Sequence, residues 1–175
     1  ASIFTLWSES ERNDIGIYTI EIDNTNLKDG QWYINTSMTY SYDSSAKKVK
    51  GAYGTATARA HADTTYTEQD KTDDLIPTGK DVGDVKEEGL KTILIRQVKN
   101  DAKSKLDATD WYVTRKSEEG TAIPSAITTH RKAVRTKQAE METAITNAAD
   151  TAALETLYRR GDNNERPLGD LPNLE

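Results

Sequence analysis

The spacing of apolar residues changes halfway along the chain, and this change limits the folds that the sequence can adopt. Before residue 60, apolar residues alternate with polar ones, as in Tyr18, Ile20 and Ile22. A period of two residues is typical of a half-buried β-strand. After residue 84, apolar residues recur every third or fourth position, which is the period of a helix. The sequence therefore predicts an α+β protein, with a small N-terminal antiparallel β-meander followed by a C-terminal helical hairpin or bundle.

The predicted meander consists of short β-type runs separated by residues that favour turns. After "IYTIEI" come "QWYIN", "MTYSYD" and "KVKGAYGTA", with Asn, Asp and Ser clusters between them. A short helical turn should precede the first strand, because Ser8 and Glu11 have the spacing of a capping box and Gly16 follows as a stop. We expect the aromatic residues of this half to supply cross-strand contact area.

Four helices are predicted in the second half. Leu90, Leu94, Val98, Ala102 and Leu106 are spaced four residues apart and define the core-facing stripe of the first helix. The second should run from 110 to 119 and end at Gly120, and the third should open near Pro124. The third helix carries one mixed stripe: Ile127, Arg131, Val134, Gln138, Met141, Ile145 and Ala148. Asp150 or Thr151 should cap a short fourth helix, with Gly161 as its stop.

These patterns divide the chain into four parts. We expect a β-rich domain over residues 1–60, an acidic linker over 61–84, a helical domain over 85–160 and an extended arm over 161–175. The arm is rich in Pro and Leu, and we expect deletion of 166–175 to weaken assembly without unfolding the domain.

Composition argues against several classes of protein. Only 35% of the residues are hydrophobic and 30% are charged, which is a thin core for an enzyme with a deep pocket and favours burial against a partner. The net charge of −6 argues against a general nucleic-acid binder. The basic run "HRKAVRTK" (130–137) is followed directly by an acidic segment, so it fits a solvated or protein-binding helix face better than a phosphate site. There is no cysteine, no apolar stretch long enough to cross a membrane and no signal-peptide pattern at the first residues.

No arrangement of residues predicts catalysis, a cofactor or a metal. Adjacent carboxylates such as Glu87 and Glu88 point apart on a helix and do not form a catalytic pair. His61 and Asp63 have the spacing of a metal pair, but no third ligand accompanies them, so we interpret them as a polar loop pair. His130 has cationic neighbours, and we expect it on the surface or facing a partner.

The helix predicted over 110–119 has an aromatic and cationic cluster. Trp111 and Arg115 are neighbours on one helix face, so the guanidinium can lie along the indole, and Arg115 can pair with Glu118 or Glu119. Trp111 should be buried between the first and third helices and set their crossing.

The same stretch, "LDATDWYVTRKSEEGTAIPSAITTHRKAVR" from Leu106 to Arg135, resembles the C-terminal motif of the bacteriophage tail assembly chaperone family, also called tail-fibre assembly proteins. The segment "SESERNDIGIYTI" is similar to an acidic helix and strand of that family, and the meander resembles that of marine-phage proteins. The residues that match the motif are Leu106, Thr109, Asp110, Trp111, Arg115, Glu118, Gly120, Pro124, Arg131, Ala133 and Arg135.

The resemblance implies a non-enzymatic tail protein, made in the host cytoplasm and located in the virion tail. It would act in several copies through contacts with other tail or tail-fibre proteins, either as a retained component or as an assembly factor, without nucleic acid or membrane. The alternative is a glycan- or ion-binding module that aids host attachment. The residues expected to contact partners are Tyr18, Trp32, Tyr40, Tyr42, Pro167, Leu168, Leu171 and Leu174.

Overall fold

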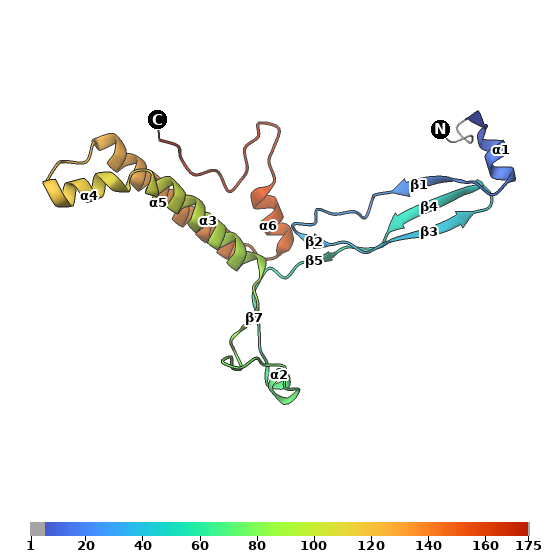
Figure 1. Cartoon of the computed structure of the whole chain (residues 1–175), viewed down its shortest axis with the longest axis horizontal. Helices are drawn as coiled ribbons and strands as arrows, with labels where there is room; N and C mark the ends of the chain where they lie inside the picture. Colours follow the sequence, from blue (N-terminus) through green and yellow to red (C-terminus); the bar gives the residue numbers. More distant parts are fainter. Residues whose placement is uncertain (1–5, 175) are drawn as a thin grey trace. The chain divides into compact units, whose positions relative to one another are not determined.

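The structure, a computed structural model, describes residues 6–174 of the 175-residue chain. Strands lie toward its N-terminus and helices toward its C-terminus, which confirms the predicted α+β class (Figure 1). The chain divides into two compact units, one ending at Arg59 and the other beginning at Ala60.

The first unit opens with α1 (Glu9–Asp14), whose two ends follow the sequence prediction. The Ser8 hydroxyl accepts the Glu11 backbone N–H, and the Glu11 carboxylate accepts the Ser8 N–H at 2.8 Å, which completes the capping box. Gly16 has a φ of +82°, a conformation that glycine adopts without steric cost. The chain can therefore turn there and enter the first strand.

A three-stranded sheet follows, in the order β1 (Thr19–Asp23), β4 (Lys48–Tyr53), β3 (Met38–Asp43). The hairpin of β3 and β4 is antiparallel, as expected, but β1 runs parallel to β4. The prediction of an antiparallel meander was therefore wrong for β1. Alternation of apolar residues determines which side chains share a face of the sheet. It does not determine which strands pair or whether they run parallel or antiparallel.

A second, smaller ladder pairs β2 (Tyr33–Ile34) with β5 (Thr57–Ala58) in antiparallel fashion. Trp32, directly before β2, is buried, and its carbonyl accepts the backbone N–H of Arg59. Trp32 was expected to contact partners. Its side chain is only 3% exposed, so it is a core residue instead.

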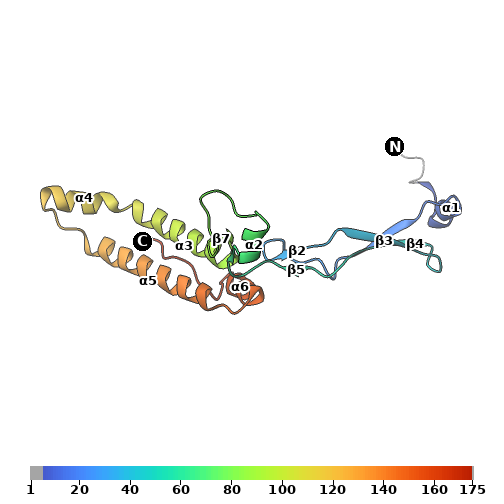
Figure 2. The ribbon, with the colours of Figure 1, turned by 90° about the horizontal axis from the view of Figure 1, so that it is seen from below.

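The second unit is built on two long antiparallel helices, α3 (Leu90–Asp107) and α5 (Ser125–Asn147), which lie side by side (Figures 1 and 2). Their direction is evident from the contacts at the two ends. Lys91 at the start of α3 donates to the Thr146 carbonyl near the end of α5, and Arg131 near the start of α5 donates to the Leu106 carbonyl.

The predicted stripes of these two helices form the core between them. The buried members on α3 and α5 are Leu90, Leu94, Val98, Ala102, Ile127, Arg131, Val134, Met141 and Ile145. The helix periodicity therefore predicted most of the core positions of both helices. Leu106 and Gln138 are only partly buried, and His130, outside the predicted stripe, is buried. Arg131 is the one charged side chain among them, and its role is described with the functional site.

Two shorter helices flank this pair. Helix α4 (Asp110–Glu119) has the bounds expected from the sequence, and Gly120 ends it with a φ of +72°. Helix α6 (Thr151–Tyr158) begins at Asp150, whose carboxylate accepts the Ala153 N–H. It ends at Tyr158, before the predicted stop at Gly161, because Arg159 has already taken an extended conformation.

The segment expected to be an acidic linker has short elements of its own and belongs to the second unit. It contains β6 (Thr64–Thr65), α2 (Glu68–Thr72) and β7 (Val85–Glu87), with β6 and β7 paired antiparallel. Thr67 caps α2, and Asp70 closes the capping box. Lys86 lies 2.5 Å from Asp70, and this contact, together with hydrogen bonds from Thr67, lowers the pKa of Asp70 to about 2.

The C-terminal arm packs on its own unit, and this packing covers one of the residues that were expected to contact partners. The backbone N–H of Leu168 donates to the Leu157 carbonyl at 3.0 Å, and the Leu168 side chain is only 3% exposed. Arg166 lies over the Tyr158 ring at 5.1 Å, and Lys105 of α3 donates to Asn173. Leu168 is therefore a core residue and not an available contact for partners.

This packing predicts that Leu168→Ala destabilises the second unit. Removing a fully buried leucine side chain costs about 2–5 kcal/mol, because apolar contact is lost and a cavity remains. Urea unfolding should show this loss. Leu174→Ala, in the same arm but 46% exposed, is the control and should change stability by less than about 0.5 kcal/mol. Equal effects of the two substitutions would contradict the packing of the arm.

Candidate functional site

One buried arginine joins the three helical segments of the stretch from Leu106 to Arg135. Arg131 projects from α5, and its Nη1 lies 2.9 Å from the Leu106 carbonyl and 2.7 Å from the Thr109 hydroxyl. The same nitrogen lies 2.8 Å from a carboxylate oxygen of Asp110. The end of α3 and the first residue of α4 are therefore attached to α5 through one guanidinium.

This cluster accounts for several positions of the motif in physical terms. Thr109 is almost fully buried, and its hydroxyl also donates to the Leu106 carbonyl at 2.9 Å. Such a buried polar group is tolerated only when its hydrogen bonds are made. Leu106, Thr109, Asp110 and Arg131, which are separated by up to 25 residues, form one structural corner.

Trp111 does not fill this corner, contrary to the sequence prediction. It is 51% exposed, and no residue of α4 is buried. Thr109 and Arg131 occupy the junction, and Trp111 follows Asp110 on the first turn of a helix that packs little of its surface on the rest of the unit. The prediction failed because the size of a side chain does not determine which face of its helix meets a neighbour.

Three side chains of α4 instead form a cluster at the surface, which we call the Trp–Tyr–Arg cluster: Trp111, Tyr112 and Arg115. Trp111 is exposed, and Tyr112 and Arg115 are partly buried. The two rings lie with their centroids 3.8 Å apart at an angle of 31°. The Arg115 guanidinium lies 4.8 Å from the Trp111 ring and 5.5 Å from the Tyr112 ring. The predicted cation–π contact between Trp111 and Arg115 is confirmed.

Arg115 has no carboxylate partner within residues 6–174. The expected ion pair with Glu118 or Glu119 is not formed, and both glutamates are exposed. Its Nε is buried without a hydrogen-bond acceptor in that range. The Arg115 guanidinium lies near the Trp111 and Tyr112 rings, and its terminal N–H groups are available to a carboxylate of another molecule.

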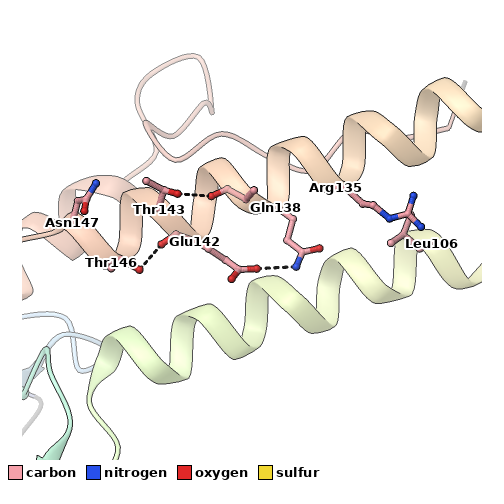
Figure 3. Close-up of a pocket in the computed structure, with 8 residues that line it drawn as sticks. Leu106, Arg135, Gln138, Glu142, Thr143, Thr146 and Asn147 are labelled. Atoms are coloured by element: carbon pink, nitrogen blue, oxygen red, sulfur yellow. Dashed lines mark hydrogen bonds between the residues drawn. The ribbon is translucent and has the colours of Figure 1, made fainter.

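The remaining motif residues shape the ends of these helices. Gly120 supplies the left-handed turn after α4, and Pro124 precedes the first residue of α5, where its missing N–H leaves no donor unsatisfied. Arg135 is exposed one turn after Arg131. It lies beside Leu106 at one end of a shallow groove between α3 and α5 (Figure 3).

The groove in Figure 3 is lined mainly by polar side chains of α5. Gln138 donates to Glu142 at 2.8 Å, and Lys99 of α3 lies 3.5 Å from the same carboxylate. Thr143 and Thr146 donate to backbone carbonyls of their own helix. These polar groups already have hydrogen-bond or ion-pair partners within the protein, so few of them are free to bind a ligand. The groove is therefore a weaker candidate for a functional site than the Trp–Tyr–Arg cluster.

His61 and Asp63 form part of the cap of α3. The N-cap residue of α3 is Gly89, which has no side chain to accept the free N–H groups of the first turn. The carbonyls of Ala60 and His61 accept the N–H groups of Leu90 and Lys91. A Cβ at Gly89 would lie 2.2 Å from the Ala62 backbone, so only glycine fits there.

Asp63 completes this cap with both carboxylate oxygens. One accepts the Gly89 N–H at 2.7 Å, and the other accepts the Thr92 hydroxyl at 2.9 Å. These hydrogen bonds lower the pKa of Asp63. Within the described part of the chain, no three His, Asp or Glu side chains gather as they would around a metal ion.

His130 was expected on the surface or facing a partner, but it is buried within the chain. It lies on α5, in a depression that it shares with Pro172, Asn173 and Leu174 of the arm. The prediction considered only the charged neighbours of His130 in sequence and did not anticipate that the arm folds back beside α5.

The residues expected to contact partners fall into three groups. Trp32 and Leu168 are core residues, as described. Tyr18 is partly buried and stacks on exposed Tyr42 with ring centroids 4.6 Å apart. Tyr40, Pro167 and Leu174 are exposed, and Leu171 is partly buried.

No protein-family model, curated protein sequence or solved structure matches this chain. No helix within residues 6–174 is long and apolar enough to cross a membrane.

The corner predicts a strong dependence of stability on Arg131. Arg131→Ala removes the hydrogen bonds to Leu106 and Thr109 and the packing of the arginine stem, and it should cost about 2–4 kcal/mol in urea unfolding. Arg135→Ala, one turn away and exposed, is the matched control and should cost less than about 0.5 kcal/mol. A small effect of Arg131→Ala would mean that the corner does not hold the helices together.

The cap of α3 predicts that divalent cations have no specific effect on stability. Because both oxygens of Asp63 accept hydrogen bonds within the protein, dialysis against EDTA should leave the melting temperature unchanged. Later addition of excess Ca²⁺, Mg²⁺ or Zn²⁺ should also leave it unchanged, since only an ion that binds the folded chain raises it. A saturable increase would favour the ion-binding alternative.

Proposed function

We propose that this chain is a non-enzymatic bacteriophage tail protein that acts through protein–protein contacts, as a component of the tail or tail fibre or as a tail-fibre assembly factor. The observation that carries the proposal is the Trp–Tyr–Arg cluster. It lies on a helix that buries none of its own residues, so its surface is available to a partner.

The composition of the cluster suits a protein interface. Trp, Tyr and Arg are the residue types that most often dominate binding energy between proteins. The two rings and the guanidinium are already stacked, so little side-chain freedom would be lost when a partner covers them.

The cluster also defines the chemistry of the partner surface. An apolar patch would cover Trp111, and a nearby carboxylate would pair with Arg115, which has no such partner within the described residues. We infer that the partner presents an acidic side chain beside an apolar depression.

The assignment to a phage tail is supported by the sequence motif. The corner formed by Leu106, Thr109, Asp110 and Arg131 gives a structural reason for four of the motif positions, and Gly120 and Pro124 give reasons for two more. The proposed partners are other tail or tail-fibre proteins, the proposed location is the virion tail, and the site of synthesis is the host cytoplasm.

Deletion of the gene from the phage that carries it should yield particles that lack tails or tail fibres in electron micrographs. The double substitution Trp111→Ala and Arg115→Ala should reproduce this defect. Loss of an anchor residue of this kind weakens binding by about 2 kcal/mol or more, which is roughly 30-fold in Kd. Circular dichroism of the purified variant should show an unchanged helix content, because neither side chain is buried.

Lys116→Ala is the control, since Lys116 is a neighbouring exposed cation outside the cluster. It should leave particle morphology unchanged. Mass spectrometry of purified particles distinguishes a retained component, which is present, from an assembly factor, which is absent. Normal tails, fibres and infectivity after deletion of the gene would contradict the proposal.

A further inference from the structure

The three-stranded sheet of the first unit has one face without charge. The register pairs Ile20 of β1 with Val49 of β4 and Val49 with Tyr42 of β3, so these three side chains lie on the same side. The next matched row on this side contains Ile22, Gly51 and Tyr40. The whole face consists of Ile20, Ile22, Met38, Tyr40, Tyr42, Val49, Gly51 and Tyr53. We call it the apolar sheet face.

The opposite face is polar and internally paired. Lys48 lies 2.5 Å from Glu21, and Lys50 lies 2.9 Å from Asp43. The two faces of the sheet therefore differ as the inner and outer faces of a packed sheet do.

The apolar sheet face is nevertheless exposed. Ile20, Ile22 and Tyr42 retain 54%, 56% and 50% of their accessible surface, and Tyr40 retains 61%. Gly51 at the centre has no side chain, and a Cβ there would lie 2.9 Å from both the Met38 sulfur and the Tyr40 ring. Side chains of β3 thus lie over the central strand.

We propose that a second copy of this chain covers the apolar sheet face, so that two sheets pack face to face across a two-fold axis. A sheet with one apolar face is stable when a second layer covers that face. The other elements of the first unit are the short helix α1 and the two-residue strands β2 and β5, and they leave the face open.

The area fits such a pair. Ile20, Ile22, Tyr40 and Tyr42 each leave roughly half of their surface of about 150–200 Å² uncovered. Together they expose roughly 400 Å² of apolar surface. Contiguous patches above a few hundred Å² are uncommon on monomers. With a polar rim, the patch forms the centre of a standard interface of about 800 Å² per partner.

Electrostatics determines which face two copies would use. Each chain has a net charge of −6, so two copies repel one another when charged surfaces meet. The apolar sheet face has no charged residue, and its tyrosine hydroxyls lie on large rings that can reach its rim. Pairing through the open edges of β1 and β3 would leave the face uncovered, so edge pairing does not replace it.

The test uses the purified full-length chain in sedimentation equilibrium. Wild type should form a dimer of twice 19.5 kDa at micromolar concentration. Ile22→Glu places a charge on the apolar sheet face and should raise the dimer dissociation constant by at least about 100-fold. Thr19→Glu places the same charge on the polar face of the same strand and should leave the dimer intact. A monomeric wild type, or equal effects of the two variants, would overturn the proposal.

Cross-linking gives a readout that does not depend on the stability of Ile22→Glu. The chain has no cysteine, so Ile22→Cys and Thr19→Cys each carry a single thiol. Packed sheets lie about 10 Å apart, so a bismaleimide of that span should join two Ile22→Cys chains and not two Thr19→Cys chains. Preferential cross-linking of Thr19→Cys, or a trimer in sedimentation, would overturn the face-to-face pair. Both measurements use only this chain, so they are independent of any tail partner.

Discussion

The packing of α3 against α5 is the interaction on which the rest of the second unit depends. Ala102 on α3 and Val134 and Ile145 on α5 have no exposed surface, so the seam between the helices excludes water. Polar contacts fix its two ends: Lys91 binds the Thr146 carbonyl at one end, and Arg131 binds the Leu106 carbonyl at the other. Because α3 and α5 bury their apolar stripes against each other, α4 is not needed to cover them, and Trp111 remains exposed.

The features that the sequence predicted well are those controlled by nearby residues. The capping box at Ser8 depends on residues three positions apart, and the turn at Gly120 requires a positive φ that glycine adopts readily. The stripe from Leu90 to Ala102 is a property of one helix. Local geometry is sufficient for such predictions, and the bounds of α4 agreed to the residue.

The predictions that failed concern features that depend on which distant segments of the chain come into contact. Trp111 is large and was expected in the core, but Arg131, 20 residues later in the chain, occupies the corner instead. Leu168 was expected to contact a partner and is buried, because the arm folds back on α6. The parallel pairing of β1 with β4 requires a crossover that alternation does not encode. The cap that Asp63 provides for α3 could have been anticipated from Gly89. A glycine before an apolar helical stripe is an N-cap residue without a side-chain acceptor, so the acceptor has to come from another segment.

The two proposed contact surfaces lie on different units and differ in chemistry, and this difference has a consequence for assembly. The apolar sheet face has no charge and is suited to a copy of itself. The Trp–Tyr–Arg cluster has a cation without a carboxylate partner among residues 6–174 and is suited to an acidic partner. A pair formed through the sheet would contain two such clusters. When a partner is itself repeated, as subunits of a tail are, the second contact becomes intramolecular and the effective affinity rises without any new interaction. Pairing of the sheets would therefore strengthen binding at α4 even though the two surfaces share no residue.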